Sequence, residues 1–277
     1  MFAAVARRLP FVSLVAAVLA ALAPAALARC TKNVAENARP IHFASLGDEL
    51  AQNPSAAASA ARVTFVGHAS YLIETPQGVR VITDYNGVNG YGRKPDIVTM
   101  NNAHGTHYTD EIEEGVKYVL RGWAEGGRDL MEHDVTLRDI QVWNVPTNVR
   151  DFGGVRRNGN SIFGFRIGDL CLAHLGHLHH RLEKEHLEQL GRIDILMVPI
   201  DGSYTMGVPL MLDVINQIQP RAVLPMHYWG SYQAERFIRL VADNYDAVWP
   251  DSRTMDFTKV GLPTKPTVYV LGGNGGD

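Results

Sequence analysis

The sequence predicts an α/β protein in which two β-sheets pack face to face and helices cover their outer faces. Three observations lead to this fold class: strand-like runs come early in the chain, strands return in its middle, and helix and strand alternate toward its end. Two segments that each offer a sheet and helices bury their apolar faces most simply as a four-layer αββα sandwich.

The N-terminal segment has the pattern of a signal peptide. Two adjacent arginines precede an apolar, alanine-rich run at 11–23, and Ala26-Leu27-Ala28 provides the small residues that a signal peptidase cleaves after. We therefore expect a signal peptide at 1–28 and a periplasmic or secreted protein, with an uncleaved membrane anchor as the alternative. The segment 29–61 is polar, alanine-rich and poorly defined, and 62–277 forms one domain.

The first predicted strands begin at residue 63, directly after this N-terminal segment. Three β-rich runs at 63–66, 71–74 and 79–83 are separated by turn residues, which predicts an antiparallel meander. The apolar run at 96–100 predicts a short buried strand. A helix is expected after it, with a capping box formed by Asp110 and Glu113. Its apolar face would carry Ile112, Val116, Val119, Leu120 and Trp123.

The rest of the chain changes from strands to an alternating pattern. Strands are predicted at 135–145, 161–167 and 170–176, and Gly168-Asp169 provides a hairpin turn between the last two. After them the sequence alternates helix with strand. The predicted helices are 181–191, 208–220 and 232–245, and the predicted strands are 193–200, 222–228 and 267–271.

Charge and cysteine content narrow the function. The net charge is -3 and no long basic run occurs, so no nucleic acid is expected and a small-molecule substrate is the default partner. Two cysteines, Cys30 and Cys171, are too few for a disulfide framework. A bridge between them is possible, but the sequence does not decide it, and Cys171 has the pattern of a small buried hydrophobe.

Six of the eleven histidines fall at predicted strand ends. Strand ends on one rim of a sheet converge in space, and neutral imidazole nitrogens are ligands that zinc binds well. Their joint placement therefore predicts a metal site at that rim. These residues are His68, His104, His107, His174, His177 and His227.

Several motifs give the chain a family resemblance. The runs "VTFVGHASYLIETPQGVRVITDYN", "NNAHGTHYTDE", "LCLAHLGH", "VPIDGSYTM" and "VLPMHYWG" resemble, in order and spacing, those of metallo-β-lactamase-fold hydrolases. The chain looks most like the branch that contains ascorbate-6-phosphate lactonase. This resemblance implies an αββα sandwich with one or two metals on the rim where the sheets meet.

The resemblance also shows departures from the family motifs. The histidine-rich turn H-x-H-x-D-H falls on Asn102, His104, Thr106 and His107, so two of its four ligands are changed. The next motif histidine falls on Arg150, which cannot ligate a cation. These changes imply that one of the two metal half-sites is lost.

The other half-site keeps good ligands. The bridging aspartate of the family falls on His177, the final histidine falls on His227, and Asp84 matches an aspartate that supports the histidine turn by hydrogen bonds. The resemblance implies a site of His107, His177 and His227, with His104 either as a fourth ligand or as the general base. His174 is the other candidate base.

We therefore expect a mononuclear site, with Zn²⁺ favoured and other divalent metals possible. The predicted activity is hydrolysis of an ester, lactone, amide or phosphodiester bond by a metal-bound water. The alternative is a catalytically silent binding protein that keeps the fold, because Asn102, Thr106 and Arg150 depart from the ligand pattern.

Overall fold

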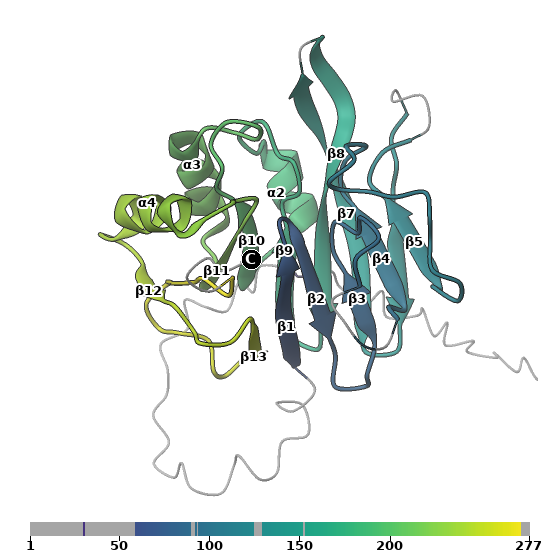
Figure 1. Cartoon of the computed structure of the whole chain (residues 1–277), viewed down its shortest axis with the longest axis horizontal. Helices are drawn as coiled ribbons and strands as arrows, with labels where there is room; N and C mark the ends of the chain where they lie inside the picture. The colour runs from purple at the N-terminus through teal and green to yellow at the C-terminus, as the bar shows by residue number, and fades with distance from the viewer. Residues whose placement is uncertain are drawn as a thin grey trace, which may run out of the picture.

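The computed structural model describes Cys30 and residues 59–89, 92, 94–124, 129–151 and 153–272. The signal peptide predicted at 1–28 lies outside these residues. No helix in the described part of the chain is long and apolar enough to cross a membrane. Two β-sheets form the body of the protein, and Figure 1 shows the strands of one in front of those of the other, with α3 and α4 to one side.

The first sheet has six strands in the order β13-β1-β2-β3-β4-β5. The β1, β2 and β3 strands pair antiparallel, which confirms the predicted meander, whereas β3, β4 and β5 run parallel. The strands are β1 (Ala60–Gly67), β2 (Ser70–Glu74), β3 (Arg80–Ile82), β4 (Ile97–Met100), β5 (Tyr118–Arg121) and β13 (Thr254–Thr258).

The second sheet has eight strands in the order β12-β14-β11-β10-β9-β8-β7-β6. Its central strands β9, β10, β11 and β14 are parallel, and their continuous apolar sequences are buried on both faces. The β7–β8 hairpin is long and projects beyond the sandwich (Figure 1). The strands are β6 (Asp134–Leu137), β7 (Ile140–Asp151), β8 (Gly154–Ile167), β9 (Leu170–His174), β10 (Ile195–Pro199), β11 (Ala222–Met226), β12 (Asp246–Val248) and β14 (Thr267–Tyr269).

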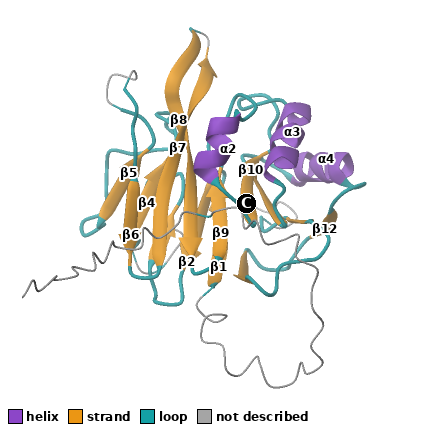
Figure 2. Ribbon diagram, turned by 180° about the vertical axis from the view of Figure 1, so that it is seen from behind, coloured by secondary structure: helices purple, strands orange, loops and turns teal. Residues whose placement is uncertain are grey.

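Three helices, α2 (Lys184–Leu190), α3 (Val208–Ile218) and α4 (Ser231–Val241), lie beside the parallel strands (Figure 2). All three were predicted from the alternating pattern. In α4 the buried residues Ala234, Phe237 and Val241 are three and four positions apart, so one stripe of the helix packs on the sheet.

The strand alternation divides the apolar residues into layers. In β10, Met197 packs between the two sheets, whereas its neighbour Leu196 packs toward the helices. The layer between the sheets also contains fully buried aromatic residues such as Tyr71 and Phe163. These layers fix the two sheets face to face, as the sequence predicted, and place their strand ends along a common rim.

The prediction of a helix after the histidine turn is wrong. Residues 110–117 form irregular turns and bends, Gly115 has a φ of 88°, and the chain then enters β5, which pairs parallel with β4. Asp110 makes an ion pair with Arg121 at 2.8 Å instead of capping a helix. Pairing with β4 overrides the helical spacing, because Val119 gains a partner in Val98.

The apolar residues of that segment nonetheless pack against the protein core. Ile112, Val116, Val119 and Trp123 pack on the outer face of the six-stranded sheet, against residues that include Val98. Among the described residues this outer layer is therefore irregular chain, whereas the other sheet has a helical layer.

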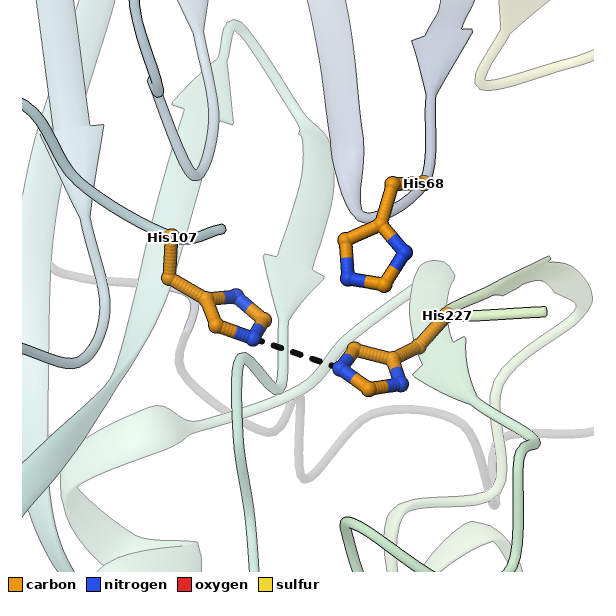
Figure 3. Close-up of side chains that lie close together, drawn as sticks. All are labelled: His68, His107 and His227. Atoms are coloured by element: carbon orange, nitrogen blue, oxygen red, sulfur yellow. Dashed lines mark hydrogen bonds between the residues drawn. The ribbon is translucent and has the colours of Figure 1, made fainter. Parts of the chain in front are cut away.

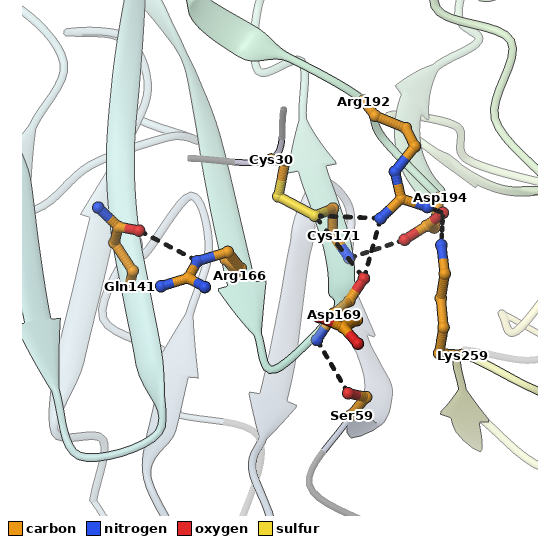
Figure 4. The surroundings of a disulfide bond; sticks show 9 residues. All are labelled: Cys30, Ser59, Gln141, Arg166, Asp169, Cys171, Arg192, Asp194 and Lys259. Carbon is orange, nitrogen blue, oxygen red and sulfur yellow. Dashed lines mark hydrogen bonds and ion pairs between the residues drawn. A yellow bond between two sulfur atoms is a disulfide. The ribbon is translucent and has the colours of Figure 1, made fainter. Parts of the chain in front are cut away.

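A disulfide joins Cys30 to Cys171, across a sequence separation of 141 residues and a Cα–Cα distance of 6.1 Å. Arg192 donates its backbone N–H to the carbonyl of Cys30 at 2.6 Å, and Asp194 donates its own to that of Cys171 at 2.8 Å. Figure 4 shows Lys259 and Arg192 both reaching the carboxylate of Asp194 beside the bridge. The structure thus resolves the pairing that the sequence left open, and Cys171 is a bridge partner as well as a core residue.

Loss of this bridge is expected to destabilise the protein. The double variant Cys30→Ser with Cys171→Ser should lose about 2–5 kcal/mol of unfolding free energy, because the unfolded chain is no longer constrained by a long closed loop. Denaturant unfolding with and without a reductant measures this. The reductant should lower the unfolding midpoint of the unmodified protein and leave that of the double variant unchanged. Equal midpoints for the two proteins without reductant would contradict the expectation.

Candidate metal centre

Four histidine side chains meet at the rim of the sandwich, and each sheet contributes two. His68 lies in the β1–β2 turn and His107 in the loop after β4, whereas His177 follows β9 and His227 follows β11. Figure 3 shows His68, His107 and His227 with their rings pointing toward one another. The predicted convergence of strand ends therefore occurs, and it brings together residues up to 159 positions apart.

The distances between ring nitrogens are short. His107 Nε2 lies 3.3 Å from His227 Nε2 and 3.1 Å from His177 Nδ1. One ring nitrogen from each of His68, His107 and His227 falls within a group whose members are no more than 4.8 Å apart. The His68 and His227 rings are 4.3 Å apart between centroids. His107 and His227 thus form the centre of the cluster, with His68 and His177 beside them.

Two buried carboxylates lie behind the central pair. His107 Nδ1 donates to Asp84 Oδ2 at 2.7 Å, and His227 Nδ1 lies 3.1 Å from Asp201 Oδ1. A carboxylate only accepts hydrogen bonds, so Nδ1 of His107 carries the proton and its Nε2 presents a lone pair. His227 Nδ1 faces Asp201 at ion-pair distance without a hydrogen bond. This carboxylate–histidine arrangement is the one that orients metal-binding imidazoles.

The histidine cluster fits a metal ion. Nε2 of His107 lies 3.3 Å from Nε2 of His227 and 3.1 Å from Nδ1 of His177, and a cation among these ring nitrogens could be bound by all three. Tetrahedral zinc with bonds of about 2.0–2.1 Å separates its nitrogen ligands by about 3.3 Å. The Nε2 atom of His68 is also buried, with no hydrogen-bond partner among the described residues.

Burial favours the neutral form of the flanking histidines, and hydrogen bonds favour the charged form of the supporting carboxylates. Burial, together with the nearby His227 and His107, lowers the pKa of His68 to about 4. Burial alone would raise the pKa of Asp84, but the neighbouring His107 and its hydrogen bond outweigh burial, and the pKa is lowered. The pKa of Asp201 is likewise lowered, since the neighbouring His227 and hydrogen bonds from the 203–205 turn outweigh burial. Neutral imidazoles are the form that binds a metal.

Three of these residues have unusual backbone conformations. His68, Asp84 and His227 have φ values of 48°, 46° and 58°, in the left-handed region that non-glycine residues rarely adopt. Such conformations cost free energy and persist where surrounding structure determines them, often at functional sites. Their concentration in one cluster supports a functional role for it.

The other predicted site residues lie at the edge of the cluster or away from it. His104 is exposed at the rim, with its ring 5.8 Å from that of His107 and its Nδ1 3.0 Å from Thr106 Oγ1. His174 is fully buried; its Nε2 contacts the carbonyl of Ala69 and its Nδ1 accepts the N–H of Gly176. Both nitrogens of His174 are therefore occupied by the main chain.

Asn102, Thr106 and Arg150, three of the altered motif positions, do not enter the cluster. Asn102 is buried and forms an isolated bridge with Asn160 across the two sheets. Arg150 is exposed on β7. Thr106 and His104 line a cavity beside the cluster, whereas Arg150 is not among the described residues that line it. The changed positions therefore leave the four-histidine cluster intact.

Two residues were missed by the sequence reasoning. His68 was recognised at a strand end but left out of the predicted ligand set, and Asp201 was not assigned a role. A signal for Asp201 exists, because it comes soon after β10, the parallel neighbour of the strand that precedes His227. For His68 the missing information was geometric, since its turn has to fold back over the rim.

A cavity of about 680 Å³ opens beside the cluster, within the usual range for small-molecule sites. The histidines on its wall are His68, His104, His177 and His227. Its remaining wall includes the aromatic residues Phe65, Tyr204, Tyr228 and Trp229, together with Arg253, Asn86, Thr106 and three glycines.

A two-sheet α/β sandwich with a histidine cluster at the strand ends between its sheets is the architecture of metallo-β-lactamase-fold proteins. Residues 62–227 match the beta-lactamase superfamily domain, so the chain belongs to that family. The resemblance seen in the sequence is therefore confirmed at the level of the superfamily, while the ascorbate-6-phosphate lactonase branch stays a prediction.

Individual relatives agree with this assignment. A UPF0173 metal-dependent hydrolase of Pyrococcus horikoshii is 29% identical over 213 residues, which cover 68% of this chain and 95% of the relative. Another, from Thermococcus kodakarensis, is 27% identical over 212 residues with the same coverage. A metallo-β-lactamase superfamily protein from Thermotoga maritima superposes with a TM-score of 0.53 at 24% identity, covering 76% of this chain and 97% of that one.

Asp84→Asn is expected to weaken metal binding by about 10- to 100-fold. Asp84 Oδ1 accepts the backbone N–H of Asn101 at 3.0 Å, so an asparagine would keep its oxygen there and turn its NH₂ toward His107. His107 Nδ1 would then have to accept, and Nε2 would carry the proton instead of a lone pair. Zinc titration against a competing chelator measures the change.

The matched control is Asp213→Asn, which removes the same charge from an exposed ion pair with Arg181. Zinc affinity should stay unchanged in this control. An unchanged affinity in Asp84→Asn as well would contradict the role given to the Asp84–His107 pair.

Proposed function

We propose that this protein is a metal-dependent hydrolase and that His107 and His227 are its central metal ligands. The observation that carries the proposal is the pair of facing Nε2 atoms, 3.3 Å apart, each backed by a buried carboxylate. Membership of the superfamily and the metal-dependent hydrolases among the relatives support it.

We propose one Zn²⁺ ion, with His68 and His177 completing the ligand set on either side of the central pair. Four neutral nitrogen donors suit zinc better than magnesium or calcium, which prefer oxygen. His104, which the sequence placed in the ligand set, is moved to the rim in this proposal, because its ring is exposed and its Nδ1 lies 3.0 Å from Thr106 Oγ1.

The bound metal would supply Lewis acidity to a carbonyl or phosphoryl oxygen and make a water molecule more acidic. The protein itself would supply the proton acceptor, and His104 is the residue proposed for that role. It faces the cavity, and its pKa is lowered by burial and by the nearby His107 and His227, so the ring is neutral near pH 7. His174 is a poorer candidate, since the main chain occupies both of its ring nitrogens.

The bond that is cleaved is proposed to be an ester, lactone, amide or phosphodiester, and the substrate a small molecule that fits the cavity. A catalytically silent binding protein is the alternative, and the exchanged motif positions Asn102, Thr106 and Arg150 favour it. We also propose export to the periplasm or outside the cell. The Cys30–Cys171 bridge supports export, because disulfides persist in oxidising compartments.

The double variant His107→Ala with His227→Ala is expected to lose zinc and all chelator-sensitive turnover of generic ester and phosphodiester probes. Elemental analysis after zinc loading and removal of the excess metal measures binding, and stoichiometric zinc should remain only in the unmodified protein. A control variant, His180→Ala with His186→Ala, changes two neighbouring histidines that do not line the cavity, and it should keep both properties. Failure of the unmodified protein to hold a metal under any loading condition would favour the silent binder.

Single variants should separate the ligands from the proton acceptor. His68→Ala is expected to weaken zinc binding, whereas His104→Ala should keep the zinc and lower turnover by about 10²–10⁴-fold. Metal affinity and kcat are measured on the same preparations. The reverse pattern, with zinc lost in His104→Ala and kept in His68→Ala, would restore the ligand set that the sequence alone predicted.

A further inference from the structure

The cavity wall opposite the histidines has a distinct chemical character. Among the described residues that line the cavity, none is acidic, and Arg253 is the one with a permanent charge. The other non-histidine residues of the wall are four aromatic residues, the neutral polar Asn86 and Thr106, and three glycines. A ligand that matches this wall has an apolar surface and one negative charge.

Arg253 is held in a defined orientation. Its Nε donates to the carbonyl of Phe65 and its Nη2 to that of Val66, both at 3.2 Å, and the guanidinium lies 5.4 Å above the Phe65 ring. These contacts occupy one edge of the group. Among the described residues, none accepts a hydrogen bond from Nη1 in the structure, so that side of the fork remains for a ligand.

Arg253 also lies close to the metal centre. A Cβ atom at Gly67 would meet Arg253 Nη2 at 4.0 Å, so the guanidinium is beside the backbone that leads directly into His68. An anionic group bound by Arg253 would therefore lie in the same cavity as the histidine cluster. This is the position from which a charged group can orient a neighbouring reactive bond.

Two aromatic side chains remain largely uncovered at the mouth of the cavity. Tyr204 and Trp229 are 66% and 62% exposed, and their rings meet edge to face with centroids 5.7 Å apart. Trp229 is also 5.6 Å from the ring of His227. Large exposed aromatic surfaces beside a polar centre are well placed to pack on a flat apolar ligand.

We propose that the cavity selects substrates with a planar apolar body and a single carboxylate, with Arg253 binding the carboxylate and Trp229 and Tyr204 the apolar body. This specificity rests on the proposed hydrolase function of the histidine cluster. A guanidinium fork matches a carboxylate in shape, and one fixed arginine balances one negative charge.

The test is direct binding of 2-naphthoate and its neutral isostere 2-naphthamide to the metal-free protein, followed by Trp fluorescence or calorimetry. Metal-free protein is used because a carboxylate could otherwise bind the metal. 2-Naphthoate should bind more tightly than 2-naphthamide, and Arg253→Gln should remove this preference by weakening 2-naphthoate about 10- to 100-fold. Trp229→Leu should weaken both ligands.

Two controls keep the result interpretable. Unchanged binding of 2-naphthamide by Arg253→Gln would show that the cavity is intact, and Arg253→Lys, which retains the charge but not the fork, should give an intermediate affinity. Arg236→Gln removes a charge from the exposed side of α4 and should bind both ligands as the unmodified protein does.

Equal affinity for the two ligands, or a preference that survives Arg253→Gln, would overturn the proposal. Tighter, Arg253-dependent binding of 2-naphthyl phosphate would overturn the assignment of a carboxylate. Neither result depends on metal binding or turnover, so failure of this specificity and failure of the hydrolase function can be told apart.

Discussion

The candidate site depends on two buried carboxylates, one supported by each sheet. Asp84 and Asp201 are expensive to bury, and they are stable there because each accepts several hydrogen bonds. Asp84 takes the N–H of Asn101 and the ring of His107, while Asp201 takes the backbone N–H groups of residues 203–205 and approaches the ring of His227. The Asp84–His107 bond fixes which nitrogen of His107 faces the cluster. Without it this ring could rotate or change tautomer, and its lone pair toward the cluster would be lost.

The fold explains how such an arrangement can be held rigidly. The central histidines follow β4 and β11, which are fully buried strands of different sheets, so neither loop can move without disturbing the packed layer between the sheets. This arrangement costs conformational free energy in the backbone, because His68, Asp84 and His227 adopt left-handed conformations. A further bond links the two halves directly, because the N–H of His227 donates to the carbonyl of His68 at 2.7 Å. The turn of one sheet is thus tied to the strand end of the other.

Much of this could be predicted from the sequence, because strand periodicity and strand ends are local patterns. The three helices, the meander and a gathering of strand-end histidines needed only those patterns, whereas the set His107, His177 and His227 came from the family resemblance. The helix expected around Val116 failed because its apolar spacing suits two structures, and pairing with β4 decided between them. The choice between His68 and His104 as neighbours of the central pair depended on how two turns fold over the rim. The sequence carries no periodic signal for such a turn.

The chemistry of the cluster and that of the cavity wall are connected through charge. Where the family motif places carboxylates, this chain has Thr106 and His177, so the carboxylates that remain, Asp84 and Asp201, stand behind the rings instead of facing the cavity. A cation held by neutral imidazoles would keep most of its positive charge toward the cavity, and Arg253 adds to it on the neighbouring wall. With no acidic lining residue among those described, this charge would favour an anion over a neutral molecule of the same shape. The ligand exchanges at Thr106 and His177 would therefore act on metal binding and on substrate charge together, because both depend on the number of carboxylates that face the cavity.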